Sequence, residues 1–138
     1  MSVGLTVDLY WYQIGSGDFF HAFFSTIAHN LESGNWGSRF PVFMNEFYSG
    51  TLKIDRVDKA IAELKIIAYE LKAFSPDKVV WDIEDLSKQP PWGNNISPDI
   101  TDLSNYFVTS DGDDLITIIM HAFEKGIEIE QDVCISNL

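Results

Sequence analysis

The two ends of this chain alternate between apolar and polar residues, and this pattern constrains the fold more than any other feature of the sequence. The apolar positions near the N-terminus are Val3, Leu5, Val7, Leu9 and Trp11. Those near the C-terminus are Ile127, Ile129, Val133 and Ile135. A period of two is typical of a β-strand with one buried face. The pattern therefore predicts a strand at each end of the chain, the last with an acidic outer face.

Three stretches between these ends carry apolar residues at helical spacing. They predict amphipathic helices over about 20–31, 56–74 and 115–125. The residues expected to bound these helices are Ser16 or Asp18 before the first, Asp55 before the second and Gly126 after the third.

The remaining segments are less regular. Residues 79–83 and 106–109 read as short strands, and residues 40–54 as either a strand and turn or a short helix followed by a strand. Strands at both ends with about three helices between them predict an α+β fold. We expect one two-layer domain over residues 1–138, with a mixed or antiparallel sheet packed against the helices.

The charge of the chain narrows the class of partner. Its 21 acidic and 9 basic residues give a formal net charge of −12. Binding to nucleic acid or to an anionic membrane surface needs positive charge, so we expect neither. This charge fits a basic protein partner that is attracted electrostatically. Alternatively, the acidic residues only keep the protein soluble.

The chain lacks the features of an exported or membrane protein. Its N-terminus has no basic region followed by an apolar stretch, and no run reaches the ~20 apolar residues of a membrane span. The one cysteine, Cys134, cannot form an internal disulfide. We therefore expect a cytoplasmic protein.

No motif for a nucleotide, a metal or a catalytic serine occurs in the sequence. His21 and His29 share one predicted helix, but at this spacing they lie about 12 Å apart along its axis, too far to share a metal ion. His121 is distant in sequence. We therefore predict no cofactor, no metal site and no catalytic residues.

Carboxylates crowd the segment 79–107, which also contains Trp81, Trp92 and three prolines. If 79–83 is a strand, Asp82 and Glu84 lie about 6–7 Å apart on one face, where they can form an acid–base pair or bind a divalent cation. Alternatively, Asp residues in such turn-rich sequence form only local hydrogen bonds with the backbone and have no further role. Trp92, in "PPWG", fits a residue that folds back on the core as well as an exposed binding anchor.

Two long segments of the sequence carry a family resemblance. "WYQIGSGDFFHAFFSTIAHNLE…WGSRFPVFMNEFYSG" and "VVWDIEDLSKQPPWGNNISPDITDLSNYFVTSDGDDL" resemble the Imm70-type bacterial immunity proteins of polymorphic toxin systems. The resemblance extends from about Val3 to Leu115. It implies a small cytoplasmic protein without catalytic activity, which neutralises a co-encoded toxin by binding it.

The predicted function is thus an immunity protein whose acidic surface binds a toxin domain, for example a basic nuclease. Two alternatives stay open: a small hydrolase that uses Asp82 and Glu84, and an interaction domain unrelated to toxins. Because they crowd into polar, turn-rich sequence, the expected partner-binding residues are Asp82, Glu84, Asp85, Trp92, Asp99, Asp102, Asp111, Asp113 and Asp114.

Overall fold

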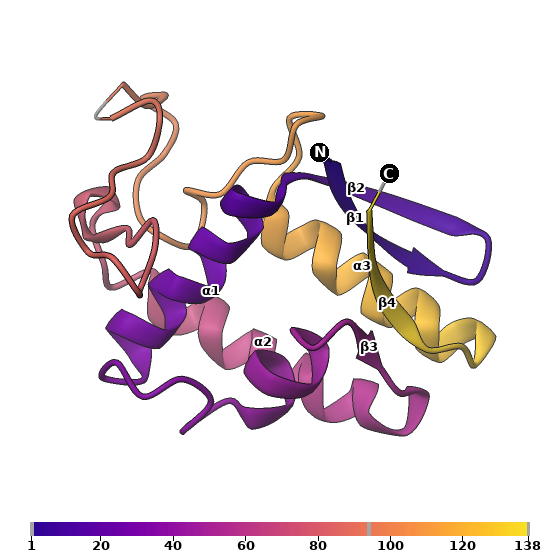
Figure 1. Ribbon diagram of the computed structural model, residues 1–138. Coiled ribbons are helices and arrows are strands. Elements are labelled where there is room, and N and C mark those ends of the chain that lie inside the picture. Colours follow the sequence, from indigo (N-terminus) through magenta and orange to yellow (C-terminus); the bar gives the residue numbers. More distant parts are fainter. Residues whose placement is uncertain (1, 94, 138) are drawn as a thin grey trace.

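The computed structural model of the chain describes residues 2–93 and 95–137. In this part of the chain, a four-stranded antiparallel sheet in the order β2-β1-β4-β3 combines with three α-helices (Figure 1). This arrangement confirms the predicted α+β class. The strands are β1 (Ser2–Val7), β2 (Tyr10–Ser16), β3 (Thr51–Leu52) and β4 (Val133–Asn137), and the helices are α1 (Gly17–Leu31), α2 (Val57–Leu71) and α3 (Leu115–Ile129).

The N-terminal alternating segment forms a hairpin, so the prediction of one continuous strand is wrong. β1 and β2 pair through a two-residue turn in which Asp8 has a φ of 54° and Leu9 is 92% exposed. Asp tolerates positive φ because its short polar side chain bonds locally. The alternation of apolar and polar residues continues through the turn, so the sequence pattern does not reveal the turn.

The first helix begins where the sequence predicted. The Ser16 hydroxyl caps α1 by accepting a hydrogen bond from the Phe19 backbone N–H at 3.1 Å. Asp55, in contrast, lies in the 3-10 turn η2 (Ile54–Arg56), and no side chain caps α2. The predicted apolar stripe of α1 is buried, and its phenylalanines pack against other aromatic rings of the core.

Residues 40–54 follow the second of the two expected patterns, a short helix before a strand. The helix is a π-helical turn, η1 (Val42–Phe47), and β3 follows it. The carboxylate of Glu63, on α2, accepts hydrogen bonds from the backbone N–H groups of Val42 and Phe43. These bonds fasten the start of η1 to α2.

The C-terminal prediction is wrong in its first half. Ile127 and Ile129 belong to α3, which continues past Gly126 to Ile129 and is followed by Glu130 with a φ of 55°. A side chain at Gly126 would approach the Gln131 carbonyl oxygen to 3.0 Å. Gly126 thus lets the chain fold back tightly from α3 into β4, and does not end the helix.

Neither strand predicted between α2 and α3 forms. Residues 79–83 make no strand pairing, and side chains of α1 instead bond the backbone of Val80 and the N–H of Ile83. Residues 106–109 contain a single bridge, between Val108 and Asp114. The first part of the long connection lies beside α1, away from the sheet (Figure 1), whereas near its end the Ser110 N–H donates to the Ile14 carbonyl of β2 at 3.0 Å. None of the described helices combines the length and the apolar character needed to cross a membrane.

Candidate functional site

Hydroxyl groups on α1 position the start of the long connection. The Thr26 hydroxyl both accepts from the Val80 N–H, at 3.0 Å, and donates to the Val80 carbonyl, at 3.1 Å. The Ser25 hydroxyl accepts from the Ile83 N–H at 3.2 Å. Both α1 residues are fully buried. Their hydroxyls bond the backbone of the connection, as a neighbouring strand bonds the backbone of a strand beside it.

This anchoring brings Asp82 next to His21, one helical turn before Ser25. The His21 Nε2 lies 3.5 Å from one Asp82 oxygen, and the Lys88 ammonium lies 3.5 Å from the other. The Glu84 backbone N–H donates to Asp82 at 2.9 Å. This hydrogen bond above all, with Lys88 and His21, lowers the pKa of Asp82 below its usual value, so Asp82 is ionised at neutral pH.

An open pocket of about 490 Å³ lies beside this cluster. The Trp36 ring stacks on the His21 ring, with centroids 6.0 Å apart and planes 22° apart, and lies edge-on to Tyr48. The Tyr48 hydroxyl is 2.7 Å from the His21 Nδ1. Burial raises the pKa of Tyr48, and the charges of Glu84 and Asp82 add to this effect. The pocket is lined by His21, Gly34, Trp36, Tyr48, Ile83 and Glu84.

The cluster contains potential metal ligands that sequence reasoning set aside. His21, Asp82 and Glu84 each offer one ligand atom, and these atoms lie within 4.8 Å of one another. Imidazole and carboxylate together suit a divalent transition metal. The Lys88 ammonium beside Asp82 opposes a second cation there by charge repulsion. The charge of Lys88 therefore weakens the binding of a metal ion by these three residues.

The hydrolase alternative required two converging carboxylates with shifted pKa values. Asp82 and Glu84 do converge, but in a turn and not on a strand as predicted, and closer together than the predicted spacing. The pKa of Asp82 is lowered, which is the opposite of what a proton donor needs at neutral pH. The geometry favours a fixed negative charge over an acid–base pair.

Trp92 is both packed and exposed. Its indole N–H donates to the Tyr106 hydroxyl at 2.8 Å, and its ring meets Trp81 edge-on at 5.4 Å. Even so, 37% of Trp92 remains exposed. Trp81 is half-buried and packs against the core. Trp92 thus closes over the core and keeps one free surface.

The other predicted acidic residues occupy separate turns. Asp102 accepts hydrogen bonds from Ser104 in one turn, and the exposed Asp99 lies in the turn before it. Asp111 and Asp113 are exposed in the turn before α3, and Asp114 caps that helix by accepting from the Thr117 N–H at 3.0 Å. Of the predicted set, Asp82, Glu84 and Asp85 come together in one turn.

Sequence reasoning missed the pocket residues His21, Trp36 and Tyr48. Each belongs to a different segment, and their proximity depends on how residues 32–48 fold over α1. The buried Glu32 carboxylate accepts backbone N–H groups from Gly37 and its neighbours and fixes that fold. The only signal in the sequence was a polar residue, His21, next to an apolar stripe.

Comparison with known protein families gives a match over most of the sequence. The model of a protein family described as immunity protein 70 matches residues 5–135, which is nearly the whole chain. No curated protein and no solved structure shows significant similarity to the sequence.

Proposed function

Because this chain belongs to the immunity protein 70 family, we propose that it binds a co-encoded toxin domain in the cytoplasm and blocks that toxin's activity. In this proposal the chain acts by occupying the toxin and performs no catalysis of its own. The lowered pKa of Asp82 supports binding over catalysis, because a carboxylate that stays ionised at neutral pH serves as a fixed recognition group.

The contact surface is centred on the turn that carries Asp82, Glu84 and Asp85. One observation carries this choice: the turn is acidic and accessible, yet hydrogen bonds to buried groups of α1 hold its backbone in place. A surface that is already ordered loses little conformational entropy on binding. This contact surface extends over the exposed part of Trp92 and over the turns that contain Asp99, Asp102, Asp111, Asp113 and Asp114.

The partner surface is basic. A net charge of −12 attracts a cationic protein over several ångströms and speeds encounter at low ionic strength. Protein groups that bind phosphate are often cationic, so a nuclease domain is a suitable target. The carboxylates of this chain then occupy the nuclease cleft in place of the nucleic acid.

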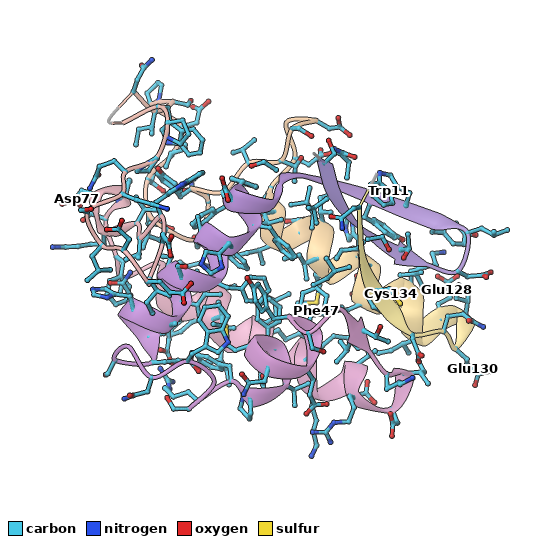
Figure 2. All side chains as sticks on the ribbon, in the orientation of Figure 1. Trp11, Phe47, Asp77, Glu128, Glu130 and Cys134 are labelled. Atoms are coloured by element: carbon cyan, nitrogen blue, oxygen red, sulfur yellow. The ribbon has the colours of Figure 1, made fainter. Side chains whose placement is uncertain are left out.

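Binding and rescue of growth test this function together. The toxin domain encoded beside this gene is expressed with the wild-type protein, and complex formation is measured by calorimetry. The test variant carries D82N, E84Q and D85N, and a charge-matched control carries D58N, E124Q and E128Q. The control acids are exposed on α2 and α3. Glu128 lies at the opposite end of the molecule from Asp77, which precedes the test turn by a few residues (Figure 2).

We expect the wild-type and control proteins to bind and to protect cells, and the test variant to bind at least about tenfold more weakly. The association rate should fall as salt concentration rises. An equal loss in both triple variants would contradict the proposed surface. A wild-type protein that neither binds the toxin nor restores growth would instead favour an interaction domain unrelated to toxins.

A further inference from the structure

We propose that the pocket beside His21 receives an arginine side chain from a protein partner, which is the toxin domain if the proposed function holds. The pocket lies between α1, the segment 34–36, the end of η1 and the turn 83–84. It combines aromatic walls with a carboxylate at its rim, and a guanidinium group needs both.

The walls suit a flat, delocalised cation. Trp36 and His21 present nearly parallel rings, and Tyr48 closes the pocket at an angle to Trp36. A guanidinium stacks on aromatic faces, and indole is the strongest aromatic partner for a cation. The walls are also rigid, because Trp36 donates from its Nε1 to the Met44 carbonyl at 2.8 Å and stacks on the buried Phe24.

The rim supplies a carboxylate that has no ion-pair partner among the described residues. Glu84 lines the pocket and is exposed, and no lysine, arginine or histidine among the described residues lies within ion-pair distance of it. Asp82, in contrast, already contacts Lys88 and His21. Glu84 is therefore the carboxylate available to a cation that enters the pocket.

Other ligands fit this combination less well. The carboxylates Glu84 and Asp82 repel an anion. A lysine ammonium is compact and strongly hydrated, and it neither stacks nor binds a carboxylate through two parallel hydrogen bonds. A divalent cation would meet the Lys88 ammonium beside Asp82. Arginine uses the flat walls and the free carboxylate at once.

A titration without the toxin isolates the pocket from the proposed function. The ¹⁵N-labelled protein is titrated with Nα-acetyl-arginine amide, and its NMR spectrum reports on the Trp36 indole N–H and the Gly34 and Glu84 amides. Nα-acetyl-citrulline amide has nearly the same shape without the charge, and the lysine analogue has the charge without the plane. E84Q removes the free carboxylate, and E124Q is the control on α3.

We expect saturable shifts at these three groups with the arginine compound, weaker binding of the lysine compound, and no saturable shifts with citrulline. E84Q should weaken arginine binding about fivefold, which corresponds to about 1 kcal/mol, and E124Q should leave it unchanged. Equal binding of citrulline, shifts that never saturate, or an equal effect of both variants would overturn the proposal. Saturable shifts at the same groups with Zn²⁺ but not with arginine would also overturn it, in favour of a metal site.

The toxin complex gives the second arm. If E84Q weakens both arginine binding and toxin binding, the pocket and the proposed function are supported together. If arginine binds but the toxin does not, the proposed function fails while the pocket stands. If the toxin binds wild-type protein and E84Q equally and arginine does not bind, the pocket fails and the proposed function stands.

Discussion

The Thr26 hydroxyl forms two hydrogen bonds with Val80: it accepts from the Val80 N–H and donates to the Val80 carbonyl. A single buried hydroxyl thus replaces the pairing that a neighbouring strand would give. It fixes the path of the turn that carries Asp82 and Glu84.

Thr26→Val should detach this turn while keeping the volume of the side chain. The variant leaves two backbone groups without partners, so we expect its free energy of unfolding to fall by about 1–3 kcal/mol. The Val80 amide should exchange faster with solvent, and toxin binding should weaken. Urea denaturation and hydrogen exchange measure these effects. Thr26→Ser keeps the hydroxyl and should slow exchange at Val80 back toward the wild-type rate; an exchange rate unaffected by Thr26→Val would refute the anchoring role.

Glu32→Gln should destabilise the segment that places Trp36 in the pocket. Glu32 is 2% exposed, and its two oxygens accept three backbone N–H groups, from Gly37, Arg39 and Phe40. Glutamine has one oxygen and turns an NH₂ group toward these donors. Since hydrogen bonds to a charged group contribute about 1.5–3 kcal/mol each, we expect a loss in that range.

The control for this variant is Glu124→Gln, which makes the same chemical change at an exposed position of α3. Urea denaturation of both variants measures the difference. Equal unfolding midpoints for the two would contradict this role of Glu32.

The parts of the fold that the sequence predicted are those governed by local periodicity. The apolar stripe of α1 and its Ser16 cap depend on residues within one or two turns of each other, and both formed as expected. Where two periods fitted, the prediction was wrong: Ile127 and Ile129 continue the spacing of α3 as well as that of a strand.

The candidate site needed contacts between distant segments. Val79 and Val80 are apolar enough for a strand, but α1 offers hydroxyls where a strand would have needed a backbone partner. The pairing of His21 with Asp82 follows from that anchoring, and no local pattern contains it. The carboxylates were thus recognised from the sequence, whereas the aromatic walls beside them were not.

Gly4→Ala should disturb the hairpin because Trp11 lies directly over Gly4. An added Cβ would overlap the Trp11 ring and come within 2.6 Å of the Tyr12 carbonyl oxygen. The backbone cannot give way cheaply, so we expect a loss of about 1–3 kcal/mol and a change in tryptophan fluorescence. Gly17→Ala is the matched control, since its Cβ would meet only Val3, at 3.8 Å. Thermal unfolding that ranks Gly17→Ala as the less stable variant would contradict the close approach of Trp11.

The ion pair between Arg39 and Glu70 should make stability depend on pH. The guanidinium donates to both Glu70 oxygens at 2.7 Å, and this hydrogen bonding lowers the pKa of Glu70 below its usual value of 4.5. A carboxyl whose pKa is lower in the folded state stabilises the fold above its unfolded-state pKa, and this contribution is lost as the pH falls through the folded-state pKa. The pair is partly exposed, so Glu70→Gln should lower the free energy of unfolding at pH 7 by at most about 1 kcal/mol. Denaturation from pH 7 downward should show this difference shrinking below pH 4.5; a difference independent of pH would assign it to packing instead of charge.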